Sequence, residues 1–261
     1  MLYEKTNYLN PNISYLINTF IYEYDISKAN ITILYQEGVI DKQTYDRLKS
    51  VPRMERQVTI GYILKKRENN DILKQGICNA RRVLFESNNI QDYEVLSIKN
   101  DAVYVIGRPL HNTAFGIVEF TLRNIYTSFY SINNLEIYYA YNADGSEVID
   151  IKGINNNTLE LHKNGFLMIL KDLCYQCQSF GPSQASALLK LIYEKYINLD
   201  FPINIYREFN SLSLYKIYST LNQGSFGFES IDETYKNIID ISYNENILRE
   251  LNILFIDMII R

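Results

Sequence analysis

The segment that most constrains the fold runs from residue 17 to residue 38, where one hydrophobic pattern gives way to another. Residues 17–26 are mostly β-branched or aromatic, which is typical of a buried or half-buried strand. From Ser27 onward the apolar residues fall at helical spacing, with Ser27 placed to cap the helix and Gly38 to end it. Asp25 therefore stands where a strand passes into a helix. A carboxylate at that position can hold a metal ion without movement of the backbone.

A second acidic residue occupies a predicted hairpin tip further along the chain. Two β-rich runs, 95–98 and 102–107, flank the polar sequence Lys99-Asn100-Asp101. Asn-Asp is common in tight turns, so we expect Asp101 to project from the tip. Magnesium prefers oxygen ligands, and two metal ions about 4 Å apart can bind both the attacking and the leaving oxygen of a phosphoryl transfer. The two aspartates are therefore candidate metal ligands.

At these residues the sequence resembles the palm region of family A and family B DNA polymerases, as a divergent, phage-type member. Residues 24–30 (Tyr-Asp-Ile-Ser-Lys-Ala-Asn) resemble motif A, in which an aspartate ends the first palm strand. Residues 98–105 (Ile-Lys-Asn-Asp-Ala-Val-Tyr-Val) resemble motif C, with Asp101 in the place of that motif's second carboxylate. Lys99 and Asn100 stand at the preceding positions, so the extra acid of motif C is absent.

Two weaker matches keep the order of the family. Residues 56–62 (Arg-Gln-Val-Thr-Ile-Gly-Tyr) resemble the family A fingers motif, with Arg56 in the place of the lysine that binds the incoming triphosphate. Arg53 lies one residue from the place of that motif's upstream arginine. Residues 148–154 resemble the Lys-Gly segment that follows motif C in family B, where Lys152 would face the template-primer. The resemblance covers roughly residues 18–154 and is patchy.

The resemblance implies a template-dependent nucleotidyltransferase that uses two Mg²⁺ ions, dNTP and primer-template DNA. Asp25 and Asp101 would be its catalytic metal ligands, with the carbonyl of Ile26 as a further ligand. The remaining site residues that it implies are cations: Arg53, Arg56, Lys65 and Lys66 for the triphosphate, and Lys152 for the nucleic acid.

The alternation of patterns predicts an α+β protein: an antiparallel, palm-like sheet with packed helices, followed by a helical C-terminal region. We expect a palm-like domain over 1–154, a fingers-like helical insertion at about 41–89, and a thumb-like or docking domain over 155–261. Residues 1–16 are expected to form an irregular arm. The remaining expected elements are a short capped helix from Asp41 to Lys49, helices at 53–68, 71–87, 159–178, 183–196 and 239–260, and strands at 115–122, 126–132, 135–141 and 148–151.

Charge is distributed unevenly along a chain whose net charge is −4. Residues 42–82 carry eleven basic and four acidic side chains, so the rest of the chain has a net charge of −11. A fingers element would meet triphosphate and template in this basic segment, although a helical surface also carries Lys and Arg for solubility. The acidic C-terminal helices favour docking to other protein subunits over binding DNA.

The cysteines and tyrosines carry weaker signals. Cys174 and Cys177 form a lone C-x-x-C, and with only His111 and His162 as imidazoles in the chain we favour buried thiols over a zinc site. The tyrosines between 126 and 141 are at positions from which they could stack on bases, but half-buried strand aromatics are the favoured interpretation.

Neither a signal peptide nor an apolar run of membrane-spanning length is apparent, so we expect an intracellular, cytoplasmic protein without membrane partners. The abundance of Asn, Ile, Tyr and Lys suggests an AT-rich genome, such as that of a phage, in which case the location would be the host cytoplasm.

Two alternatives to an active enzyme stay open. One is a catalytically inactive, polymerase-derived DNA-binding or assembly protein of a replication, transcription or virion complex, which the missing motif C acid favours. The other is an unrelated α+β interaction protein in which Asp25 is a helix cap and Asp101 belongs to an ordinary turn. The deciding geometry is whether the two carboxylates converge.

Overall fold

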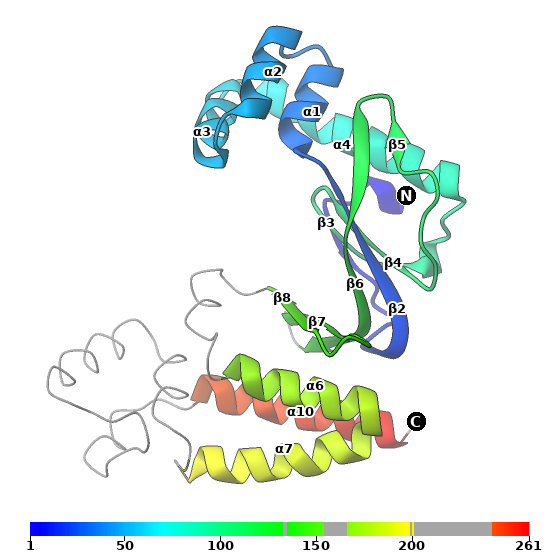
Figure 1. Cartoon of the computed structure of the whole chain (residues 1–261), viewed down its shortest axis with the longest axis vertical. Helices are drawn as coiled ribbons and strands as arrows, with labels where there is room; N and C mark the ends of the chain where they lie inside the picture. Colours follow the sequence, from blue (N-terminus) through cyan, green and yellow to red (C-terminus); the bar gives the residue numbers. More distant parts are fainter. Residues whose placement is uncertain (133–134, 154–165, 199, 201–241, 261) are drawn as a thin grey trace, which may run out of the picture. The chain divides into compact units, whose positions relative to one another are not determined.

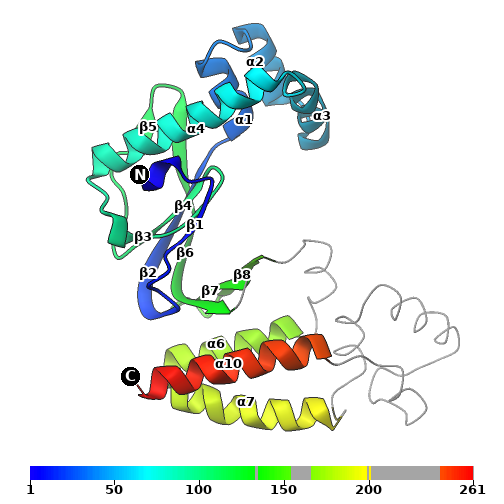
Figure 2. The ribbon, with the colours of Figure 1, turned by 180° about the vertical axis from the view of Figure 1, so that it is seen from behind.

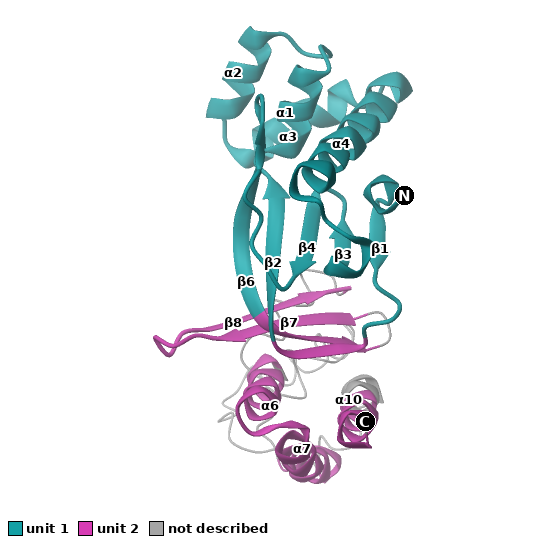
Figure 3. Ribbon diagram, turned by 90° about the vertical axis from the view of Figure 1, so that its right-hand side faces the viewer, with its two compact units in different colours: residues 1–13, 19–126 teal, residues 14–18, 127–261 magenta. Residues whose placement is uncertain are grey.

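The computed structural model describes residues 1–132, 135–153, 166–198, 200 and 242–260. The chain divides into two compact units (Figure 3): residues 1–13 with 19–126, and residues 14–18 with 127–261. The strands β2 (Tyr15–Ile26) and β6 (Val118–Ile132) contribute residues to both units. The domain boundary predicted after residue 154 lies outside the described residues.

The first unit contains an antiparallel sheet, which confirms the predicted fold class. Its strands lie in the order β1 (Asn7–Leu9), β3 (Val95–Lys99), β4 (Ala102–Ile106), β2 and β6. β3 and β4 form the predicted hairpin, with Lys99 opposite Ala102. β2 pairs with β4, and this register sets Asp25 opposite Ala102. The short β5 (Ala114–Phe115) pairs with β6.

Alternation along β2 separates an apolar face from a polar one. Tyr24 and Ile26 enter the hydrophobic core of the first unit, whereas Glu23 and Asp25 have the opposite parity and belong to the other face. Helices α1 (Ala29–Gln36) and α4 (Arg67–Asn88) complete that core and pack against each other (Figure 1). The helix side of the core consists mainly of Ala29, Ile31, Ile33, Leu34, Leu73, Ala80, Leu84 and Phe85.

Between α1 and α4 the chain forms two of the helices predicted from the sequence, α2 (Lys42–Ser50) and α3 (Arg53–Ile63). Asp41 caps α2 as expected, because its side chain accepts a hydrogen bond from the Thr44 backbone nitrogen at 2.7 Å. The expected cap at Ser27 is wrong. Lys28, at φ 51°, is the N-cap of α1, and the Ser27 carbonyl instead accepts a hydrogen bond from the Thr32 hydroxyl.

Two further expectations need correction. The arm over residues 1–16 is not irregular: it contains the 3-10 helix η1 (Leu2–Glu4), β1 and the start of β2, and Figure 2 shows the N-terminus next to α4. The separate strands expected at 115–122 and 126–132 are largely one strand, β6. A second 3-10 helix, η2 (Asp92–Glu94), joins α4 to β3.

Within its described residues, the second unit combines the end of β6 with β7 (Leu135–Tyr141), β8 (Glu147–Lys152) and the helices α6 (Phe166–Phe180), α7 (Pro182–Ile197) and α10 (Ser242–Ile260). The strands pair antiparallel. α7 packs against both α6 and α10 (Figure 1). None of the helices in the described ranges has both the length and the apolar character needed to cross a membrane.

The burial of the cysteines and tyrosines decides between the interpretations that the sequence left open. Cys174 and Cys177 are free, buried thiols, as favoured from the sequence. Of the tyrosines proposed for base stacking, only Tyr141 is substantially exposed, at 41%. The others are fully buried and so are not accessible to nucleic acid: Tyr126, Tyr130, Tyr138 and Tyr139.

Gly76 on α4 is required for the close packing of α4 on α1, which gives a first prediction. A Cβ at Gly76 would overlap the Cγ2 methyl of Ile33, so Gly76→Ala is expected to destabilise the protein by roughly 1–2 kcal/mol despite alanine's higher helix propensity. Gly61→Ala on α3 is the matched control, because nothing lies within 4 Å of the added atom. It should stabilise by up to about 1 kcal/mol. Urea unfolding of both variants tests the packing, and equal effects would contradict it.

Candidate functional site

The two aspartates selected from the sequence come together in the first unit. Asp25 is the next-to-last residue of β2, and Asp101 lies in the two-residue turn between β3 and β4. Because Asp25 pairs with Ala102, the turn places Asp101 beside it, and the two carboxyl groups are within hydrogen-bonding reach. The predicted convergence is therefore observed for residues that are far apart in the sequence.

The carboxylate of Asp25 is partly buried and lies close to the charges of Asp101, Glu23 and Arg123. Its pKa is raised to about 6, first by burial and then by the charge and hydrogen bond of Asp101. Glu23 adds a smaller effect in the same direction. The guanidinium of Arg123 opposes these effects, with its Nε 3.4 Å from Oδ2 of Asp25. Two like charges held this close attract a cation strongly, and Arg123 supplies only part of the neutralising charge.

Glu23 is a third carboxylate close to the pair, but it is already occupied by hydrogen bonds. It accepts from the hydroxyl of Tyr104 at 2.7 Å, from Nδ2 of Asn124 at 2.6 Å and from the hydroxyl of Tyr126 at 3.0 Å. These donors satisfy both carboxylate oxygens and fix the side chain in the buried part of the sheet. Over the described ranges, no group of three or more His, Cys, Asp or Glu side chains is arranged to hold a metal ion.

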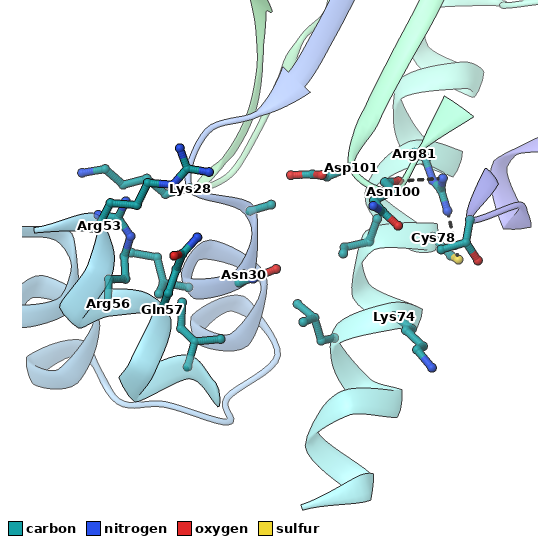
Figure 4. A pocket seen from close by; sticks show the side chains of 16 residues that line it. Lys28, Asn30, Arg53, Arg56, Gln57, Lys74, Cys78, Arg81, Asn100 and Asp101 are labelled. Atoms are coloured by element: carbon teal, nitrogen blue, oxygen red, sulfur yellow. Dashed lines mark hydrogen bonds between the residues drawn. The ribbon is translucent and has the colours of Figure 1, made fainter. Parts of the chain in front are cut away.

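A pocket of about 410 Å³ lies beside the pair, between α1, α3, α4 and the β3–β4 turn (Figure 4). Asp101 lines it and is directed toward the space between its walls in Figure 4. All the other charged side chains of the lining are basic: Lys28, Arg53, Arg56, Lys74 and Arg81. The pocket is therefore suited to an anion, with a carboxylate at one side.

The walls of the pocket come from different helices. Arg53 and Arg56 project from one face of α3, together with Gln57, and Lys74 projects from α4 on the opposite wall (Figure 4). Lys28 belongs to the same wall as α3, and its ammonium group donates to the carbonyl of Lys49 at 2.9 Å. The spacing of residues 53, 56 and 57 places them on one helical face.

The other residues implied by the polymerase resemblance are not brought to this pocket. Its lining does not include Lys65, whose ammonium lies 4.4 Å from the Tyr62 ring centroid, or Lys66, the N-cap of α4. Lys152 belongs to the second unit and pairs with Asp150 at 2.6 Å. The side chain of Ile26 is buried in the core. Only its carbonyl, which directly follows Asp25, can act as a ligand.

Five charged residues of the site were missed from the sequence: Lys28, Lys74, Arg81, Glu23 and Arg123. Lys28 belongs to the segment that resembles motif A, and Lys74 belongs to the basic segment 42–82, so their places in the sequence could have indicated them. Nothing local marks Arg123, because its proximity to Asp25 depends on the position of β6 beside β2. Asp25 itself is not a helix cap, since β2 continues through Ile26.

The raised pKa of Asp25 makes the stability of the protein depend on pH. Near pH 4 and below, Asp25 is largely protonated in the folded chain, so Asp25→Asn should have little effect. Between pH 4 and 6 the unfolded chain ionises first, and wild type loses stability relative to the variant. At pH 7.5 without metal, the variant should be more stable by about 1 kcal/mol, less than the full shift implies because Asp25 is partly exposed.

Urea unfolding in EDTA at pH 4 and pH 7.5 measures this difference. The matched control is Asp46→Asn, on the exposed surface of α2, which should leave stability unchanged at both pH values. A difference between wild type and Asp25→Asn that stays the same at both pH values would count against a strained carboxylate pair.

Comparison with known proteins identifies the family. A family model described as bacteriophage PBS1 gene 130 protein matches residues 1–257, which includes both compact units. No curated protein matches the chain. The family description names no activity, so the resemblance to polymerase palms stays a prediction, whereas a phage origin agrees with the composition of the sequence. The chain belongs to the bacteriophage PBS1 gene 130 protein family.

Proposed function

We propose that this phage protein is a metal-dependent nucleotidyltransferase that adds nucleotides to a primed DNA template. One observation carries the proposal. Asp101 meets the carboxylate of Asp25 and also lines a pocket whose other charged side chains are all basic. A paired carboxylate beside a cationic pocket is the combination needed to hold divalent cations next to the phosphates of a nucleotide.

The carboxylate pair is the proposed metal site. Asp25 and Asp101 supply hard oxygen ligands, and the carbonyl of Ile26 can supply another, which suits Mg²⁺. Bound magnesium, two ions in this proposal, would neutralise charge on the attacking and leaving oxygens. Burial, and after it the charge of Asp101, raises the pKa of Asp25, and a bound divalent ion would relieve the repulsion between the two carboxylates. Arg123 would hold Asp25 in place and limit the negative charge of the pair.

The basic pocket is the proposed triphosphate site. A volume of about 410 Å³ is within the range of small-molecule pockets. Arg53 and Arg56 present guanidinium groups that match phosphate oxygens in pairs, and Lys74 adds charge from the facing helix. The apolar side chains at the pocket, such as Ile60 and Ile77, offer a surface for a base or sugar.

The same proposal implies contacts with nucleic acid and with other protein subunits. Lys65 and Lys66, at the α3–α4 junction, would extend the basic surface toward the triphosphate or DNA, and Lys152 would contact the nucleic acid backbone. The acidic C-terminal helices would bind further protein subunits, and the protein would act in the host cytoplasm.

A catalytically inactive, polymerase-derived DNA-binding or assembly protein is the second candidate. The specific observation in its favour is that Glu23 is occupied by three donors, so the carboxylate pair has no third acidic ligand in the described part of the chain. This candidate predicts binding of DNA or nucleotide without incorporation.

Extension of a labelled primer on a DNA template with dNTP and Mg²⁺ or Mn²⁺ tests the leading proposal. Asp25→Asn and Asp101→Asn should each lower the rate by at least about 1,000-fold, since charge neutralisation at the phosphoryl group carries most of this kind of catalysis. Asp46→Asn, exposed on α2, should extend primers like wild type. Activity that survives both active-site substitutions would remove the proposal, and no activity in wild type would favour the second candidate.

The triphosphate pocket gives a separate prediction. Arg56→Gln removes a guanidinium from the pocket lining and should raise the KM for dNTP about 10-fold or more, with a smaller effect on kcat. The matched control is Arg47→Gln on the exposed surface of α2, outside the pocket. Steady-state kinetics measure both constants. If the two substitutions change KM equally, the basic pocket is not where the triphosphate binds.

A further inference from the structure

Arg81 on α4 is a buried charged side chain for which the described residues provide no carboxylate. It is only 1% exposed, the most buried charged residue of the described chain. Within the described ranges its guanidinium has no carboxylate partner, and its Nε has no hydrogen-bond partner at all. Burying a cation without a carboxylate partner costs several kcal/mol unless hydrogen bonds offset the lost hydration. What Arg81 touches is therefore informative.

The contacts of Arg81 join the N-terminal arm to the turn that carries Asp101. Nη1 donates to the carbonyl of Lys5 and, at 2.9 Å, to the carbonyl of Asn100. Nη2 lies 3.5 Å from the sulfur of Cys78, one turn earlier on α4. Figure 4 shows the guanidinium behind the turn, on the side away from Asp101. A single buried side chain thus bridges a helix, the arm and the hairpin tip.

Asn100 is held at both of its backbone polar groups. Its carbonyl accepts from Arg81, and its N–H donates to the carbonyl of Thr6 at 2.7 Å. Its φ of 54° is in the left-handed region, which asparagine tolerates better than most residues. With both groups of Asn100 tied down, the next residue, Asp101, has little freedom to swing.

We propose that Arg81 is a positioning residue that holds the β3–β4 turn so that the carboxylate of Asp101 stays beside that of Asp25. The inference rests on the proposed metal site and adds to it a support from the N-terminal arm. Without such support the two carboxylates, which repel each other, would move apart by shifting the hairpin tip. Arg81 and Thr6 hold the backbone from the opposite side, so the pair is formed before a cation arrives.

Mn²⁺ binding, followed by electron paramagnetic resonance of the free ion at pH 7.5, tests the inference. Arg81→Met should weaken binding by about 10- to 100-fold, the usual effect of removing a group that orients a metal ligand. Arg81→Lys keeps the charge but not the two-carbonyl bridge and should give an intermediate loss. Arg82→Met is the matched control, because the neighbouring Arg82 is exposed and pairs only loosely with Glu86, at 3.7 Å. It should bind Mn²⁺ like wild type.

The outcomes separate this inference from the proposed function. Binding is measured at least ten degrees below the unfolding midpoint of the least stable variant, so loss of fold does not mimic loss of affinity. Should Arg81→Met fail to fold, Arg81→Lys and Arg81→Gln, neither of which can reach both carbonyls as the guanidinium does, test the same bridge. If wild type binds no more tightly than the Asp25→Asn, Asp101→Asn double variant, the metal site and this inference both fall. If wild type binds through the pair but the Arg81 variants bind equally well, only the positioning role is refuted.

Discussion

Repulsion between the carboxylates of Asp25 and Asp101 is the constraint around which the first unit is built. Two partly buried like charges at hydrogen-bonding distance are unfavourable, and the raised pKa of Asp25 expresses that cost. The register of β2 with β4 and the β3–β4 hairpin bring the two residues together. Arg123 offsets part of the charge, and Arg81 holds the turn from behind. A fold that maintains such strain at one place is typical of a binding or catalytic site.

The helical insertion places basic side chains beside the carboxylate pair. Net charge alone argues against a nucleic-acid enzyme, because the whole chain is acidic. The local distribution is different: the charged side chains that line the pocket are basic except for one carboxylate, Asp101. The lining of the pocket therefore has a net charge opposite in sign to that of the whole chain. The local distribution of charge around the pocket, and not the net charge of the chain, is therefore the relevant quantity for ligand binding.

Local signals in the sequence predicted local structure well. The β-hairpin around Asn100, the cap at Asp41 and the helix end at Gly38 all depend on a few neighbouring residues, and all were predicted correctly. Errors arose where distant parts of the chain compete with local preference. Ser27 did not become the cap, because Lys28, in the left-handed conformation, is the N-cap of α1, and the N–H of Ser27 donates to the carbonyl of Glu119 on β6. The N-terminal arm became ordered because β1 pairs with β3.

The sequence by itself determined the approximate position of most strands and helices and singled out Asp25 and Asp101, since hydrophobic period and turn chemistry are properties of neighbouring residues. Only the tertiary structure decided what surrounds those acids. It satisfied Glu23 with hydrogen bonds, set Arg123 against Asp25 and buried Arg81 behind the turn. These contacts join segments far apart in the chain through sheet pairing and helix packing. Their geometry depends on the whole fold, and no short stretch of sequence encodes it.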